Sequence, residues 1–125
     1  MEYSKIDNNT EYLINAIISM AVEAWRFRKV FEKAMSKLDI GESSRYINQY
    51  NWFYKKVTAA LEDIGLRIEN VEGKLFDVGM AVAPLNIEDF SPEDTLFVEL
   101  MMEPIIMDSE SVVRTGTVIL GRANR

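Results

Sequence analysis

The chain has 125 residues, of which 48% are apolar and 27% are charged, a composition that suits one compact domain or a helical part joined to a small sheet. Its net charge of −6 argues against nucleic acid as a general partner, because phosphate binding needs a basic surface. The chain contains no cysteine and no histidine, which excludes disulfides, thiolate nucleophiles, Ser-His-Asp triads and nearly every zinc site.

The longest uninterrupted apolar run, AIISMAV at residues 16–22, is far shorter than the ~20 residues that a membrane-spanning helix needs. It is not preceded by the basic region that a signal peptide carries. We therefore expect a cytoplasmic protein that does not associate with a membrane.

A first helix is predicted from about residue 10 to residue 38. Its apolar residues follow one another at alternating intervals of four and three, which is the seam of a left-handed helical pairing: Leu13, Ile17, Met20, Ala24, Phe27, Phe31, Ala34 and Leu38. Side chains of residues 8–10 would cap its start, and Gly41 in the run DIG would end it.

A second seam with the same spacing predicts a second helix, with Ser43 and Ser44 as cap candidates and Gly65 as the stop. The members of this seam are Tyr46, Tyr50, Phe53, Val57, Ala60 and Ile64. The linker between the helices is short, so we expect them to pack antiparallel.

Both predicted helices carry further apolar residues outside the seam. These are Ile14, Ile18, Ala21, Val22 and Trp25 in the first helix, and Ile47, Trp52, Tyr54 and Leu61 in the second. A lone hairpin buries one stripe on each helix, so the second stripe needs another surface. Two hairpins that form a four-helix bundle would bury both stripes, which predicts a homodimer with Ile14, Ile18, Trp25 and Tyr54 at its interface. The alternative is that the second stripe packs on the protein's own sheet.

The second half of the chain has the alternating pattern of short strands. The predicted strands are residues 66–71, 75–84, 95–107 and 112–121, with a polar loop at residues 86–94 and a hairpin turn at residues 108–111. Pro104 interrupts the third strand and belongs at an edge or a bulge, because proline donates no hydrogen bond. The predicted class is α+β, with a helical hairpin and dimerisation region at residues 1–65 and a small C-terminal β-sheet domain at residues 66–125.

We find no active site in the sequence. The carboxylate pairs Glu88–Asp89 and Glu93–Asp94 lie in the polar loop, where nothing desolvates them or tunes their pKa for catalysis. They also lack the spacing of a calcium loop, and the glycines never form a phosphate-binding run. The sequence therefore predicts a protein that is not an enzyme and that binds no metal and no cofactor.

A lone charge, Arg114, lies in the last predicted strand, whose sequence is VVRTGTVILG. One interpretation is an edge strand whose arginine faces solvent. The other is that this strand belongs to a surface on which a partner docks.

Four segments of the chain resemble the GrpE family, the nucleotide exchange factors of DnaK-type chaperones. They are EYLINAIISMAVEAWRFRKVFEKAM, YINQYNWFYKKVTAALEDIGLRIENVEGKLFD, MAVAP and VVRTGTVILGRA, which resemble the end of the family's long helix, its second helix with the run into the sheet, and two of its strands. The chain is similar to a short version that lacks most of the N-terminal stalk helix. It departs from the family at residues 78–80, where proline and histidine are usual, and at residues 103–105, where lysine, glycine and tyrosine are usual.

The resemblance implies a co-chaperone without catalytic residues, whose sheet domain binds the nucleotide-binding domain of a DnaK-like ATPase and promotes release of ADP. It implies partner-binding roles for Phe76, Met80, Ile105 and Arg114, the last at the place where the family keeps an arginine in the sheet domain. The alternative function is a dimeric structural adaptor that keeps this fold and has lost exchange activity.

Overall fold

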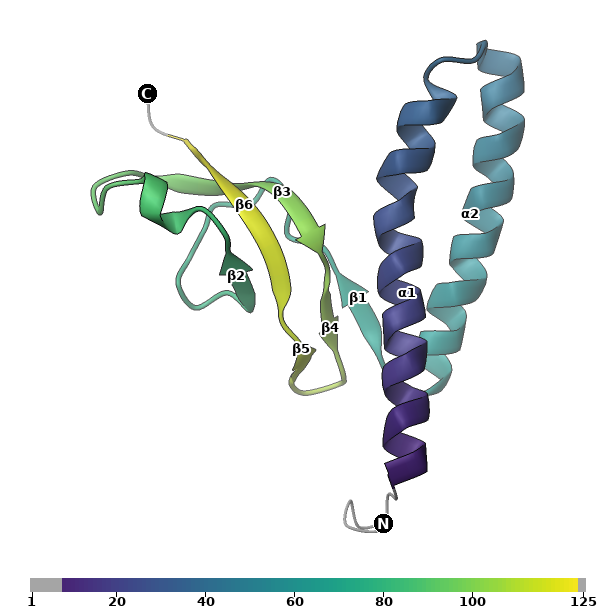
Figure 1. Ribbon diagram of the computed structural model, residues 1–125, viewed down its shortest axis with the longest axis horizontal. Helices are drawn as coiled ribbons and strands as arrows, with labels where there is room; N and C mark the ends of the chain where they lie inside the picture. The colour runs from purple at the N-terminus through teal and green to yellow at the C-terminus, as the bar shows by residue number, and fades with distance from the viewer. Residues whose placement is uncertain (1–7, 124–125) are drawn as a thin grey trace. The chain divides into compact units, whose positions relative to one another are not determined.

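The computed structural model describes residues 8–123, in which two helices are followed by six short strands (Figure 1). The chain divides into two compact units, Met1–Ile64 and Gly65–Arg125, and we refer to them as the helical unit and the β unit. The protein therefore has an α+β fold in which helices and strands occupy separate parts of the chain.

The helical unit is an antiparallel hairpin of α1, Asn8–Met35, and α2, Ile40–Asp63 (Figure 1). The prediction that Gly41 ends the first helix is wrong, because α1 ends at Met35 and Gly41 lies in α2. The cap of α2 is Asp39, which has an extended backbone and whose carboxylate accepts the N–H of Glu42 at 2.8 Å. Gly65 follows α2 with φ +81°, a left-handed conformation that glycine adopts without strain.

The residues buried in the hairpin are mostly not those of the predicted seams. The buried apolar residues are Ile18, Ala21, Val22, Ala24 and Trp25 in α1, and Tyr50 and Leu61 in α2. Of the fourteen residues in the two predicted seams, only Ala24 and Tyr50 are buried, whereas Leu13, Met20 and Phe27 are exposed. In α1 the buried stripe is displaced by about one residue from the predicted seam. Both stripes are apolar and share one period, so the period alone does not select between them.

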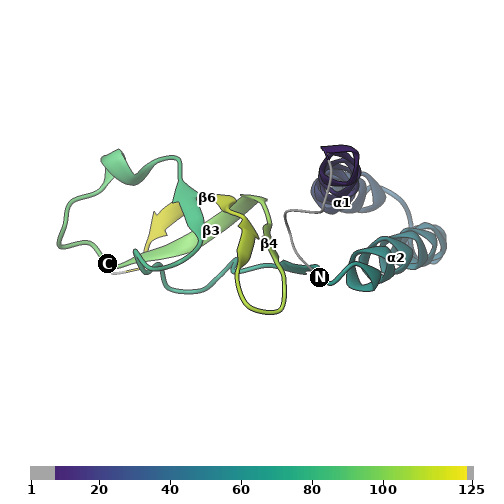
Figure 2. The same cartoon turned by 90° about the horizontal axis from the view of Figure 1, so that it is seen from below.

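The β unit contains two three-stranded sheets (Figure 1, Figure 2). The strands are β1 Arg67–Glu69, β2 Val82–Pro84, β3 Leu96–Glu103, β4 Ile105–Met107, β5 Val112–Arg114 and β6 Gly116–Arg122, with a short 3-10 helix, η2, at Ile87–Asp89. One sheet has the order β1-β4-β5 and is antiparallel. The other has the order β2-β6-β3, in which β6 is parallel to β2 and antiparallel to β3.

Two of the predicted strands are each divided between the two sheets. Pro104 separates β3 from β4, which agrees with its predicted place at an interruption, and Thr115 separates β5 from β6. At Gly116 a Cβ atom would lie 2.8 Å from the Met101 methyl carbon and 2.9 Å from the Glu103 carbonyl oxygen. The close approach of the chain at this point therefore requires glycine.

The predicted strand at residues 75–84 is a strand only in its last three residues. Residues 73–76 instead run along the edge of β3, where the N–H of Gly73 donates to the Val98 carbonyl and that of Phe76 to the Leu96 carbonyl, both at 2.8 Å. This segment protects the outer edge of β3 from pairing with another strand. The most completely buried apolar residues of the unit include Val98, Met101, Ile106, Val118 and Leu120.

Candidate interaction surfaces

An aromatic cluster joins the two helices around Tyr50. Its ring centroid lies 5.3 Å from that of Phe31, 5.9 Å from that of Phe53, 6.2 Å from that of Tyr54 and 6.4 Å from that of Phe27. The Tyr50 hydroxyl donates a hydrogen bond to the backbone carbonyl of Ala24, twenty-six residues earlier in the chain. Burial raises the pKa of Tyr50, so its hydroxyl stays protonated as a hydrogen-bond donor near neutral pH.

One side of this cluster is open. Phe27 is 51% exposed and Phe53 is 49% exposed, although both are large aromatic residues. Two adjoining hollows of about 430 and 480 Å³ share these two residues, and Met20 lines the second one. We call this surface the hairpin face, and its exposed apolar members are Leu13, Ile17, Met20, Phe27, Leu38, Tyr46, Phe53 and Ile64. These residues belong to the two predicted seams, which therefore contribute both to the aromatic contact between the helices and to their exposed surface.

The residues predicted for the dimer interface occupy a different place. Ile18 is 1% exposed and Trp25 is 2% exposed within the single chain, and Ile14 and Tyr54 are half-buried. The assignment of Ile14, Ile18, Trp25 and Tyr54 to a dimer contact stays a prediction, and the hairpin face is a second candidate surface.

The β unit has a hollow of about 550 Å³, lined by residues 75–78, 87, 90–92 and 94–96. We call it the acidic hollow, because its lining includes Asp77 and Asp94 and no basic residue. One wall is the segment that runs along β3, and the other is the loop between β2 and β3, which contains η2 (Figure 1). Apolar side chains form most of the remaining lining, among them Leu75, Phe76 and Val78.

Hydrogen bonds hold the loop wall of the acidic hollow in one conformation. The carboxylate of Asp94 accepts the N–H of Ser91 at 2.9 Å and the Nε–H of Arg122 at 3.1 Å. The side-chain amide of Asn86 bonds both the carbonyl and the N–H of Leu120 in β6, each at 2.9 Å. The Arg122 guanidinium also lies 5.2 Å from the centre of the Phe90 ring. The loop is thus fastened to β6 at two points.

The four residues predicted to bind a partner fall in two places. Phe76 lines the acidic hollow, and the half-buried Met80 accepts the N–H of Asp77 on its sulfur at 3.4 Å. Ile105 and Arg114 belong to the other sheet, in β4 and β5. Ile105 is only 3% exposed, so its side chain packs in the interior and is not available to a partner. That residue is removed from the proposed contact set.

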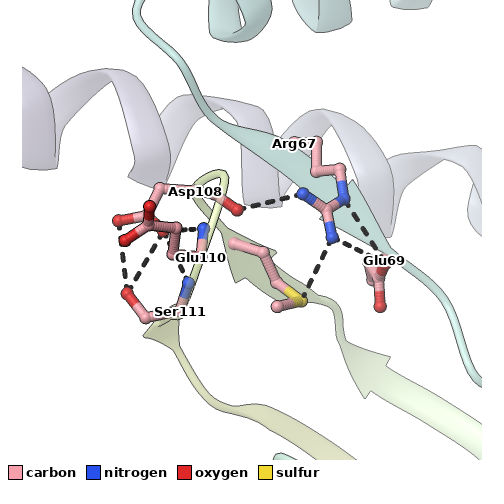
Figure 3. A network of polar contacts seen from close by, with 6 residues as sticks. Arg67, Glu69, Asp108, Glu110 and Ser111 are labelled. Carbon is pink, nitrogen blue, oxygen red and sulfur yellow. Dashed lines mark hydrogen bonds and ion pairs between the residues drawn. The ribbon is translucent and has the colours of Figure 1, made fainter.

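Arg114 is half-buried at the end of β5, the outer strand of its sheet, where it lies opposite Ile106. The turn that carries β5 is fixed by a polar network that the sequence did not suggest to us (Figure 3). Arg67 of β1 donates to the Asp108 carbonyl at 3.0 Å and pairs with Glu69 at 3.3 Å. The Asp108 carboxylate accepts the N–H groups of Glu110 at 2.8 Å and Ser111 at 2.7 Å.

The backbone of this turn stabilises the negative charge of the Asp108 carboxylate. The backbone N–H of Glu110, followed by that of Ser111, lowers the pKa of the Asp108 carboxyl. The ionised carboxylate therefore closes the turn between β4 and β5, and Arg67 ties that turn to β1 (Figure 3). The network positions the hairpin that carries Arg114.

The loop carboxylates do not gather into a chemical site. Glu88, Asp89 and Glu93 are exposed, and Asp94 is engaged by Arg122. Within residues 8–123 the structure has no group of three or more acidic side chains placed to hold a metal ion. In the same part of the chain, neither helix has the length and apolar character needed to cross a membrane.

Comparison with protein-family models, curated proteins and solved structures found no match to this chain.

Proposed function

We propose that this protein is a GrpE-like nucleotide exchange factor, a dimeric co-chaperone that binds the nucleotide-binding domain of a DnaK-like ATPase and promotes release of ADP. The observation that carries the proposal is the order of the elements. A long antiparallel helical hairpin with an open apolar face is followed by a small β unit. The resemblance of the four sequence segments implies this same order.

In the proposed dimer, a second copy of the hairpin covers the hairpin face. Exposed apolar residues on both helices repeat at intervals of four and three, which suits contact with other helices of the same period. Charged residues of both helices lie beside the seams: Glu23 precedes Ala24, and Lys56 precedes Val57. Glu23 lines the same hollow as Phe53, and Phe53 lies about one helical turn before Lys56.

The exchange step needs no reacting group on this chain. If this protein binds the ATPase more tightly when the nucleotide cleft is open, it raises the fraction of ATPase molecules in the open state. The shift equals the ratio of its affinities for the open and closed states, ~1.4 kcal/mol for each tenfold difference in affinity. ADP then leaves from the open state. The residues proposed to make this contact are Phe76, Met80 and Arg114.

The test measures release of a fluorescent ADP analogue from the nucleotide-binding domain of a DnaK-like ATPase. We expect the full-length chain to accelerate release, with a rate that saturates as its concentration rises. An unchanged rate at concentrations where binding to the ATPase domain is complete would contradict the proposed function.

The alternative function is a dimeric structural adaptor without exchange activity. The observation in its favour is that Ile105 is buried while the hairpin face leaves eight large apolar residues exposed, so the helices offer more apolar contact surface than the sheet residues implied by the resemblance. A stable dimer that binds a DnaK-like ATPase without changing nucleotide release would support the adaptor.

A further inference from the structure

The net charge of the protein resides in the β unit. Residues 65–125 contain eleven acidic and five basic residues, whereas residues 1–64 contain nine of each. The whole net charge of −6 therefore belongs to the part of the chain that carries the acidic hollow.

Two acidic residues, Asp77 and Asp94, line that hollow, and three more lie in the loop that forms one of its walls. Between residues 75 and 96 the chain has five carboxylates and no lysine or arginine. The carboxylates are Asp77, Glu88, Asp89, Glu93 and Asp94. A negative field around a concave surface attracts cationic groups and repels anionic ones.

The hollow is also unusually apolar for an exposed surface. Val78 is 91% exposed and Leu75 is 64% exposed at one wall, and Ile87 is exposed at the other. Exposed apolar side chains that adjoin one another and are rimmed by polar residues mark interaction sites. Lysine and arginine side chains combine an apolar stem with a charged end, so they match both properties of this surface.

We propose that the acidic hollow binds an extended segment of a partner protein in which lysine or arginine residues adjoin apolar side chains. This inference goes beyond the proposed exchange function and does not depend on it. The apolar side chains of the segment lie against Leu75 and Val78, and its cationic side chains face Asp77 and the carboxylates of the loop wall.

Asp77 is the carboxylate that contributes most directly. It lines the hollow, and the hydrogen bond that it accepts from the Gly79 N–H is 3.2 Å long. Asp94 lines the hollow as well, but Arg122 already offsets its charge. The walls are held by β3 and β6 through the bonds of Phe76 and Asn86, so binding requires little ordering of the loop.

The test uses the full-length, ¹⁵N-labelled chain and a short fluorescein-labelled peptide that alternates lysine with leucine. Two peptides serve as comparisons: one alternates glutamate with leucine, and the other alternates lysine with serine. We expect the lysine–leucine peptide to bind most tightly, to weaken as salt is raised, and to shift the amide signals of residues 75–78 and 87–96.

Variants of the hollow sharpen this test. We expect Val78→Ser to weaken peptide binding about 5- to 10-fold, because apolar contact area is lost. Asp77→Asn should weaken it about 2- to 5-fold, the range of an exposed ion pair. The matched controls are Val113→Ser, the same change, and Glu110→Gln, the equivalent loss of a carboxylate charge. Both lie at exposed positions of the β4–β5 hairpin and should leave the affinity unchanged.

The proposal is overturned if the glutamate–leucine peptide binds as tightly, if the amide shifts fall on the hairpin face instead, or if the control variants weaken binding as much as those of the hollow. None of these measurements involves nucleotide release. A failure of the exchange assay therefore leaves this site standing, and loss of this site leaves the exchange function open to its own assay.

Discussion

The helical unit and the β unit offer two different kinds of surface. The helical unit carries equal numbers of acidic and basic residues and exposes a long apolar face. The β unit carries the whole net charge and exposes a smaller hollow whose lining includes Asp77 and Asp94. An apolar face without net charge suits association with an identical copy, since it creates no repulsion between the copies. A strongly acidic surface repels its own copy and selects a partner of opposite charge.

The largest expected effect is on the free energy of unfolding, and it distinguishes buried from exposed positions of the helical unit. Trp25→Ala should lower the free energy of unfolding by ~3–5 kcal/mol, because the ring is almost completely buried and the change leaves a cavity. It also removes the stacking of the Arg28 guanidinium, which lies 5.6 Å from the ring centre. Urea unfolding followed by circular dichroism measures the change.

Trp52→Ala is the matched control, because this tryptophan is 65% exposed. Its removal should cost ~0.5 kcal/mol or less, as is usual for surface substitutions. Equal losses for the two tryptophans would mean that the buried and open stripes of the hairpin have been assigned incorrectly.

The second prediction tests whether the hairpin face is covered by a second copy. Phe53→Glu should leave the helices intact and shift the protein from a dimer to a species of 14.4 kDa in light scattering, because the carboxylate would be buried without a partner. Lys56→Glu at the edge of the face should weaken the dimer less. A wild-type mass of 14.4 kDa at micromolar concentration would remove the dimer from the proposal.

The third prediction concerns Arg114 in the β unit. Arg114→Ala should weaken binding to the nucleotide-binding domain of a DnaK-like ATPase by ~1–3 kcal/mol, the range of a charge-assisted contact. The free energy of unfolding should change by about 0.5 kcal/mol or less, because the residue lies at the end of an edge strand. Calorimetric titration of the wild type and the variant decides the matter. Equal affinities would return Arg114 to the role of a solvated edge residue.

The smallest effect is expected at the turn between β4 and β5 as the pH is lowered. The pKa of Asp108 in the folded protein lies below its ordinary value, so the contribution of this carboxylate to stability is fully present above the unfolded pKa of ~3.9. It is lost as the pH falls through the lower, folded pKa. The amide signal of Ser111 should report this titration, and its change over the same pH range should be much smaller in Asp108→Asn. An unperturbed titration midpoint in the wild type would show that the two N–H groups do not stabilise the charge.

Sequence periodicity predicted the two helices and the α+β class, because long runs of one period are a strong signal. It did not select the buried stripe, since Ile17 and Ile18, or Met20 and Ala21, are apolar neighbours on two adjoining faces. The choice between these faces depends on tertiary packing, which the local period of the sequence does not encode.

The candidate surfaces of the β unit were less predictable. Phe76 was expected to bind a partner and lines the acidic hollow, but the wall opposite it comes from a loop that had been interpreted only as solvated. Pro104 indicated a break in a strand without indicating that the chain changes sheets there. Hollows and sheet changes arise from pairing between segments far apart in the sequence, and no local pattern encodes that pairing.

The passage of the chain between the two sheets has a consequence for the modularity of the β unit. Glu103 at the end of β3 pairs with Thr117 near the start of β6, so residues 104–115 form an excursion between two strands that already adjoin each other. The β4–β5 hairpin is thus an insert in a β3–β6 hairpin that closes without it. Replacing residues 104–115 by a short turn would release β1 and remove the buried Ile105 and Ile106, while it leaves the pairing of β2, β6 and β3 in place. The hairpin that carries Arg114 can therefore be replaced by another hairpin without any change to the residues that line the hollow.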